Sequence, residues 1–157
     1  MDKFFFQQMN QQEAEEIAKW KYSDIYSFYD IAADEDDYLE FMDSTKRGNK
    51  YFSCYADNAL VGFYSVEVLR GHEAELGLGL KPNYTGKGYG LGFVNAVITH
   101  FTSLYRINNL VFSVASFNQR AIKVYKAAGF VENSVFTRNT NGGEYEFVRM
   151  VKKCQPI

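Results

Sequence analysis

A cluster of four glycines separates two segments of the chain that differ in periodicity, at positions 86, 88, 90 and 92. The residues before it, 73–80, alternate between two faces as a strand does. The residues after it, 90–105, carry apolar side chains at helical spacing. A strand, a glycine turn and a helix in this order leave unpaired backbone N–H groups at the helix N-terminus, where they can bind an anion such as phosphate. A flexible turn that allows close helix packing is the alternative interpretation.

The spacing of these glycines disfavours two common nucleotide-binding loops. A P-loop needs Ser or Thr after its lysine, but Lys87 is followed by Gly88. A dinucleotide-binding loop that began at Gly86 would need a glycine at position 91, where the chain has Leu91. A nucleotide-binding protein of either kind is therefore a secondary hypothesis.

The order of strand and helix patterns along the chain predicts one α/β domain over residues 1–157 with a mixed sheet. The early strands form an antiparallel meander. The central strands, beside the glycine loop at residues 85–92, are parallel. Residues 21–33 are expected to be irregular. The expected strands are 4–9, 50–56, 60–68, 73–80, 110–115, 130–137 and 144–151, and a loop is expected at 138–143. The expected helices begin at Asn10, near Asp34 (ending by 48–49), at Gly90 and at Asn118. Asn10 and Glu13 have the spacing of a capping box, and Asp57 and Asn58 predict a tight turn between two strands.

Charge and composition disfavour several classes of partner. Seventeen Lys and Arg oppose nineteen Asp and Glu, and no run of basic residues marks a nucleic-acid-binding face. No segment approaches the ~20 apolar residues of a membrane span, and the first apolar run is too short for a signal peptide. Cys54, Cys154, His72 and His100 lack metal-ligand spacing. We therefore expect a cytoplasmic protein that binds no metal, nucleic acid or membrane.

Two segments of the chain resemble the GNAT superfamily of N-acetyltransferases. In the loop after Pro82, Gly88 and Gly90 match the family signature Q/R-x-x-G-x-G/A, whereas Thr85 departs from its first position. The segment 112–130 is similar to the family's strand, N-x-x-A-x-x-x-Y helix and G-F turn. Its matching residues are Asn118, Ala121, Tyr125, Gly129 and Phe130. The resemblance implies a GNAT-like acyl-CoA N-acyltransferase fold, in which helices flank a mostly antiparallel sheet with a splayed parallel strand pair at its centre.

The resemblance also implies that acetyl-CoA is the acetyl donor. Its pyrophosphate would bind the backbone N–H groups of the glycine loop, and its pantetheine arm would pair with the end of strand 73–80 and contact Asn118. Thr85 removes one long polar side chain from the pyrophosphate site but leaves the backbone donors. The residues implied in donor binding are Leu78, Leu80, Thr85, Gly86, Lys87, Gly88, Tyr89, Gly90 and Asn118.

Acetyl transfer to an amine needs one group that removes a proton and another that protonates the leaving thiolate. Period-two geometry places Glu73 and Glu75 on one face of their strand. A half-buried glutamate beside a cleft suits a general base near neutral pH, and Glu75 matches the family position. Glu73 and Glu67 are the alternatives. The resemblance implies that Tyr125 points at the CoA sulfur. A solvated glutamate and a core tyrosine are the corresponding structural interpretations.

The resemblance implies direct attack by an amine of a small molecule or peptide within a ternary complex. Its variable acceptor site would be formed by residues 20–38 and 138–143. The aromatic residues there could bind a cationic amine or simply pack over the sheet. The acidic run 34–37 could attract a cation or favour a solvated helix start. A non-catalytic acyl-CoA-binding module remains the alternative function, and the chain is expected to be a monomer or a homodimer.

Overall fold

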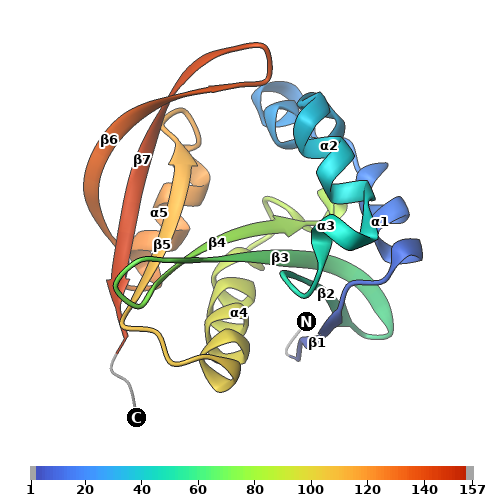
Figure 1. Cartoon of the computed structure of the whole chain (residues 1–157), viewed down its shortest axis with the longest axis horizontal. Coiled ribbons are helices and arrows are strands. Elements are labelled where there is room, and N and C mark those ends of the chain that lie inside the picture. The colour runs from blue at the N-terminus through green and yellow to red at the C-terminus, as the bar shows by residue number, and fades with distance from the viewer. Residues whose placement is uncertain (1–2, 155–157) are drawn as a thin grey trace.

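The computed structural model describes residues 3–154, which contain one seven-stranded sheet with the order β1-β2-β3-β4-β5-β7-β6 (Figure 1). The strands are β1 (Phe5–Gln8), β2 (Tyr51–Ala56), β3 (Ala59–Leu69), β4 (Glu73–Leu80), β5 (Asn109–Ala115), β6 (Val131–Thr140) and β7 (Gly143–Lys153). The α-helices are α1 (Gln11–Ala18), α2 (Glu35–Met42), α3 (Ser44–Arg47), α4 (Gly90–Leu104) and α5 (Gln119–Ala127). The short 3₁₀ helices are η1 (Asp24–Tyr29), η2 (Ile31–Ala33) and η3 (Pro82–Tyr84).

The two central strands, β4 and β5, form the parallel pair of the sheet, and the other neighbours are antiparallel. Their pairing covers only residues 73–75 of β4 and 109–111 of β5. Beyond this point β4 runs on to Leu80 beside β3, while β5 runs on to Ala115 beside β7. The two halves of the sheet diverge from here (Figure 1). The predicted mixed sheet with a splayed parallel pair is therefore confirmed.

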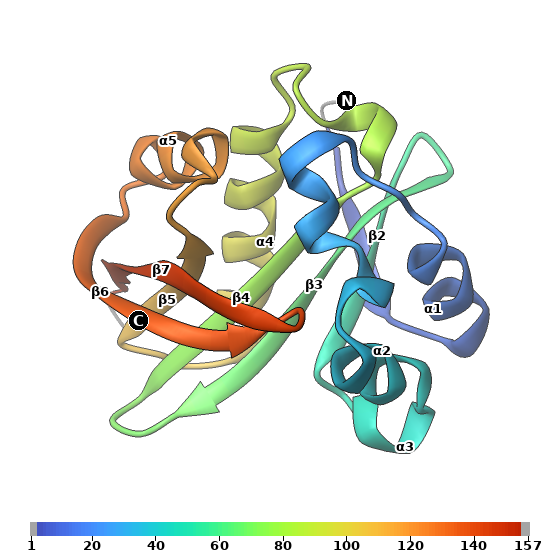
Figure 2. The same cartoon turned by 90° about the horizontal axis from the view of Figure 1, so that it is seen from above.

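Helices cover both faces of the sheet, because the strands carry apolar side chains on each face. On one face, Phe93, Val97 and Phe101 of α4 enter the larger core. On the other face, Ile17 of α1 and Phe41 of α2 enter a second core. Figure 2 shows α4 and α5 on the side of the sheet opposite α1–α3. Within residues 3–154, no helix is long and apolar enough to cross a membrane.

Capping residues define the helix ends that the sequence predicts. The Asn10 side chain accepts a 2.8 Å hydrogen bond from the Glu13 N–H, and the Glu13 carboxylate accepts one of 3.0 Å from the Asn10 N–H. This is the predicted capping box. Asn118 caps α5 by accepting from the Ala121 N–H at 3.1 Å. Gly129, with a φ of 97°, ends that helix in the left-handed conformation that glycine favours.

Two expected elements differ from the structure. The helix expected from Asp34 to 48–49 is divided into α2 and α3. The division occurs because Asp43 adopts an extended backbone and its side chain caps the Thr45 N–H at 2.9 Å. The loop expected at 138–143 is only a two-residue turn. Asn141 and Gly142 have φ values of 52° and 74°, which match a tight hairpin turn, so β6 and β7 extend towards each other.

Candidate active site

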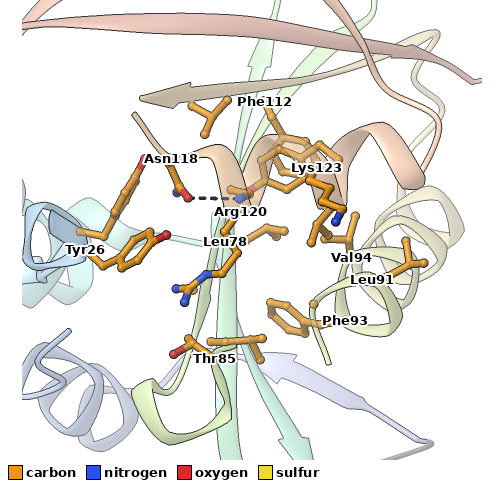
Figure 3. A pocket seen from close by; sticks show the side chains of 18 of the residues that line it. Tyr26, Leu78, Thr85, Leu91, Phe93, Val94, Phe112, Asn118, Arg120 and Lys123 are labelled. Carbon is orange, nitrogen blue, oxygen red and sulfur yellow. Dashed lines mark hydrogen bonds between the residues drawn. The ribbon is translucent and has the colours of Figure 1, made fainter. Parts of the chain in front are cut away.

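A cavity of about 620 Å³ lies in the gap between the diverging ends of β4 and β5. Residues 76–80 of β4 and 112–114 of β5 line its two sides. Its walls are completed by the glycine loop, the first turns of α4 and α5, and the segment around η1, residues 22–29 (Figure 3). This volume lies within the range of about 300–1,000 Å³ that is usual for small-molecule sites.

The cavity wall brings together most of the residues predicted to bind the donor. Lys87 and Tyr89 belong to the same loop but do not line the cavity. Lys87 is exposed, and the Tyr89 ring packs edge-on against Tyr84 with centroids 6.0 Å apart. The predicted residues that do line it are Leu78, Leu80, Thr85, Gly86, Gly88, Gly90, Asn118 and Tyr125.

The main-chain groups of Leu78 and Leu80 face the gap. The Lys81 N–H donates to the Val61 carbonyl on β3 at 2.7 Å. Because bonded pairs alternate along an antiparallel ladder, the polar groups of Leu78 and Leu80 point away from β3, towards the side where β5 has separated. The Leu80 carbonyl indeed accepts a 2.6 Å hydrogen bond from the Tyr22 hydroxyl. This edge of β4 can therefore pair with an extended, amide-bearing ligand.

The glycine loop presents backbone rather than side chains. Gly86 and Gly88 have φ values of 69° and 84°, in the region that favours glycine. A Cβ atom on Gly88 would meet nothing within 4 Å, so the peptide is open to approach. No side chain caps the N-terminus of α4 at Tyr89, which leaves its first N–H groups available for an anion. Gly90 has a packing role as well, because its Cβ position lies 3.3 Å from Val124 of α5.

Tyr125 presents a protonated hydroxyl group to the cavity. Its ring lies parallel to that of Phe112, with centroids 4.1 Å apart. Burial raises the pKa of Tyr125, and the neighbouring Tyr29 raises it further. The hydroxyl therefore keeps its proton at neutral pH and can act as a hydrogen-bond and proton donor inside the cavity.

Three glutamates lie on the same side of the sheet, and each has different surroundings. Glu75 accepts a 2.7 Å hydrogen bond from the hydroxyl of Ser113, which lines the cavity although Glu75 itself does not. Glu73 forms a 2.8 Å salt bridge with Arg149. Glu67, opposite Glu75 in the β3–β4 ladder, is exposed. Glu75 is thus the half-buried glutamate that a neutral side chain connects to the cavity.

The segment around η1 spans the gap and is attached to both diverging strands. The Tyr22 hydroxyl bonds to Leu80 at the end of β4. The Tyr29 hydroxyl accepts a 3.2 Å hydrogen bond from the Ala115 N–H at the end of β5. Burial raises the pKa of Tyr29, while a hydrogen bond with Asn118 opposes that rise. The aromatic residues in this segment were predicted near the acceptor, but their attachment to the two strands was not.

The two segments predicted to form the acceptor region lie together. At the β6–β7 turn, the Thr140 hydroxyl donates to the Asp34 carboxylate at 3.0 Å, and the Asn141 side chain donates to the Phe28 carbonyl at 2.8 Å. Asp34 also caps the N-terminus of α2. Phe28 packs edge-on against Tyr145 with centroids 4.8 Å apart. Asp34 of the acidic run 34–37 and the aromatic residue Phe28 thus have structural roles.

Arg120 and Ser113 are residues of this site that sequence reasoning missed. Arg120 lines the cavity from the first turn of α5, with its guanidinium 4.0 Å from the centroid of the Tyr26 ring. A signal was present, because Arg120 lies two positions after the helix-capping Asn118 and Ser113 lies within the matching strand segment. Neither residue occupies one of the matching positions of the family motifs.

The thiols are separate from this site. Cys54 is buried and Cys154 is half-buried, and both are free thiols. Burial raises the pKa of each of them. Among the residues that the structure describes, 3–154, no three His, Cys, Asp or Glu side chains group closely enough to hold a metal ion.

Comparison with known proteins identifies the family. The family model described as an acetyltransferase (GNAT) domain matches residues 3–131. The chain is 31% identical over 132 residues to acetyltransferase PseH of Campylobacter jejuni, an alignment that covers 80% of this chain and 81% of that protein. Its fold is similar to that of spermidine N-acetyltransferase from Vibrio cholerae in complex with CoA and spermine, with a TM-score of 0.74, 19% identity and 96% and 95% of the two chains covered. A GNAT-family acetyltransferase from Bacillus anthracis also has a TM-score of 0.74, at 16% identity, with 96% and 94% covered. This chain therefore belongs to the GNAT family of acetyltransferases.

Proposed function

We propose that this acetyltransferase moves the acetyl group of acetyl-CoA to a primary amine of a small molecule or peptide, by direct attack in a ternary complex. The observation that carries the proposal is the cavity between β4 and β5. It joins an open glycine loop, the edges of β4 and β5 that pair with no other strand there, and the Tyr125 hydroxyl in one space. The similarity of the fold to an enzyme solved with CoA and spermine supports both the donor and the amine. We propose that residues 1–157 act as a single cytoplasmic domain, without metal or nucleic acid.

The residues of the cavity fit an acyl-CoA donor. The main-chain groups of Leu78 and Leu80 would pair with the amides of the pantetheine arm, and Asn118 would contact the arm from α5. The backbone N–H groups at Gly86, Gly88 and the start of α4 would bind the pyrophosphate. The donor supplies the acetyl group as a thioester, and a backbone N–H near Leu80 would polarise its carbonyl oxygen.

We assign the two proton transfers of the proposed reaction to Glu75 and Tyr125. The amine nitrogen forms a bond to the thioester carbonyl carbon, and the bond between that carbon and sulfur breaks. Glu75 takes the proton of the amine through the hydroxyl of Ser113 or a water molecule, because Ser113 lies between Glu75 and the cavity. Tyr125 donates its proton to the leaving thiolate. Before the next turnover, Glu75 releases its proton to solvent and Tyr125 takes one back. No acyl-enzyme forms in this scheme.

The tyrosines of the segment around η1 would form the wall beside the acceptor amine. Tyr22, Tyr26 and Tyr29 line the cavity. Because the Arg120 guanidinium already lies over the Tyr26 ring, the rings of Tyr22 and Tyr29 are the ones that can attract a cation as well as pack against a carbon skeleton. This wall favours an acceptor that is cationic before it loses its proton. It does not select between a polyamine, an amino sugar and a peptide N-terminus.

A calorimetric titration with acetyl-CoA, with ATP and NAD as controls, tests the donor. A thiol-release assay over a panel of polyamines, amino sugars and peptides then tests the reaction. We expect saturable binding of acetyl-CoA alone and amine-dependent release of CoA. Binding without thiol release from any amine would identify an acyl-CoA-binding module instead. Absence of acetyl-CoA binding, or binding of a nucleotide only, would refute the proposal.

A further inference from the structure

The glycine loop offers little side-chain charge to the cavity. The Thr85 hydroxyl donates to the Pro82 carbonyl at 2.6 Å, so it is engaged within the turn. Lys87 is exposed and does not line the cavity. The loop thus supplies backbone N–H groups, which carry only partial charge, to a ligand whose diphosphate is doubly anionic. A full positive charge on this side of the cavity must come from another element.

Arg120 of α5 places its guanidinium beside this loop. Its Nη1 atom lies 3.5 Å from the position that a Cβ atom on Gly86 would occupy. Figure 3 shows the side chain reaching from α5 into the space between Tyr26 and Thr85. Within residues 3–154, Arg120 forms neither a salt bridge nor a hydrogen bond, since the salt bridges there join Lys126 to Glu132 and Arg149 to Glu73. A cation close to open backbone donors and without a carboxylate partner is suited to bind an anion.

The Tyr26 ring holds the guanidinium in place. The guanidinium carbon lies 4.0 Å from the ring centroid, which is a close cation–π contact. Stacking leaves the N–H groups at the edge of the planar guanidinium free, and these are the groups that bind phosphate oxygens in pairs. Because part of the side-chain freedom is already lost to this stacking, less remains to be lost on binding.

We propose that Arg120 is a side-chain cation that binds the pyrophosphate of the acyl-CoA donor, together with the backbone of the glycine loop. Lys123 of α5 also lines the cavity, but it is the Arg120 guanidinium that lies beside Gly86. The inference rests on the proposed function and adds a specificity-determining residue to it. Diphosphate recognition is then shared by two elements that lie apart in the sequence, the loop before α4 and the first turn of α5. The segment around η1 contributes through Tyr26.

The test compares Arg120→Gln with the wild type for three ligands that differ in their phosphates. CoA carries a diphosphate and a 3′-phosphate, dephospho-CoA carries the diphosphate without the 3′-phosphate, and pantetheine carries no phosphate and no adenosine. Dissociation constants are measured by calorimetry, with competition for weak ligands. Lys126→Gln is the matched control, because Lys126 lies on the same helix, is exposed and does not line the cavity. Thermal unfolding of both variants checks the fold.

We expect Arg120→Gln to raise the dissociation constants of CoA and dephospho-CoA to a similar extent, by about 10- to 100-fold. This is the effect expected from losing a charge-assisted hydrogen-bonded pair. Pantetheine affinity and every affinity of Lys126→Gln should match the wild type. Unchanged CoA affinity in Arg120→Gln would overturn the inference, as would a loss seen with CoA but not dephospho-CoA, which would assign Arg120 to the 3′-phosphate. An equal loss with pantetheine would show a disturbed helix instead. Failure of the wild type to bind CoA would refute the proposed function itself, a result that these outcomes do not resemble.

Discussion

The rings of Tyr125 and Phe112 lie parallel, with their centroids 4.1 Å apart and their planes at 9°. Phe112 is buried in the larger core, where it also packs against Phe130. The stack therefore fixes the plane of the Tyr125 ring from beneath, and aromatic pairs of this kind contribute about 0.5–1.5 kcal/mol beyond their burial. Removal of the hydroxyl alone leaves this packing in place.

Tyr125→Phe tests the role of Tyr125 as general acid. Because the ring and its stack are retained, we expect the affinity for acetyl-CoA to stay close to that of the wild type. We expect kcat to fall by about 10²–10⁴-fold, the usual contribution of a positioned acid or base. Calorimetry and steady-state kinetics measure the two quantities. An unchanged kcat would show that Tyr125 is a packing residue only.

Glu75→Gln tests the general base. The glutamine carbonyl can still accept the Ser113 hydrogen bond, so the local structure should be kept. We expect kcat to fall by about 10²–10⁴-fold while acetyl-CoA affinity is retained, since Glu75 does not line the donor cavity. Glu73→Gln, which breaks the salt bridge with Arg149, is the matched control and should affect kcat less. A larger loss in Glu73→Gln or Glu67→Gln would move the base to that residue.

Gly88→Ala tests the exposed peptide of the loop. At a φ of 84°, an added Cβ strains the backbone by about 1–2 kcal/mol, and it would also stand where the donor phosphate is proposed to approach. We expect the KM for acetyl-CoA to rise by about 10-fold, the effect of losing a charge-assisted hydrogen bond.

Gly71→Ala is the control for the effect of strain alone. Gly71 has a φ of 69° in the β3–β4 turn, and its Cβ position also meets nothing within 4 Å, but it does not line the cavity. Both variants should unfold at similarly lowered temperatures, and only Gly88→Ala should change KM. Equal KM values in the two variants would contradict a binding role for the loop.

The contact between His100 and Tyr64 should make the free energy of unfolding depend on pH. His100 Nδ1 lies 2.5 Å from the Tyr64 hydroxyl, and the His100 ring stacks on Phe6 with centroids 4.7 Å apart. Burial lowers the pKa of His100 from its ordinary value of 6.5. In the neutral form with the proton on Nε2, Nδ1 accepts a hydrogen bond from Tyr64, and protonation of Nδ1 would remove this acceptor.

The unfolded chain therefore binds a proton at this histidine at a higher pH than the folded chain does. The contribution of His100 to the free energy of unfolding is complete above pH 6.5 and is lost as the pH falls through 6.5 towards the lower folded pKa. Denaturant unfolding measured between about pH 5 and 8 should show a smaller pH slope in His100→Gln than in the wild type. The same slope in both proteins would exclude His100 as the cause.

The sequence predicted those features that depend on neighbouring residues. One such feature is the capping box, which depends on Asn10 and Glu13 three positions apart. Another is the turn at Asp57 and Asn58, two residues that both have positive φ. The splayed strand pair and the cavity-lining residues followed from motifs shared with a family. The break at Asp43 was missed because no glycine or proline interrupts the segment before Gly48, while the Asp43 side chain caps a new helix.

Features that depend on tertiary contacts could not be predicted in this way. The position of the Arg120 guanidinium is set by Tyr26, which lies far earlier in the chain. The connection of Glu75 to the cavity requires Ser113, and their contact depends on the register of β4 and β5. Neither distance is encoded by a local pattern, so these relationships became visible only in three dimensions.

The contacts at the β6–β7 turn have a consequence for the order of folding. The Thr140–Asp34 and Asn141–Phe28 hydrogen bonds join positions separated by 106 and 113 residues. Closing loops of this length is slow, because the chain must lose much of its freedom before these contacts form. During synthesis, η1 emerges early but can obtain these partners only after the last two strands have been made. The tyrosine wall of the cavity is thus completed late, and a partly synthesised chain that already contains both the glycine loop and η1 still lacks a finished site.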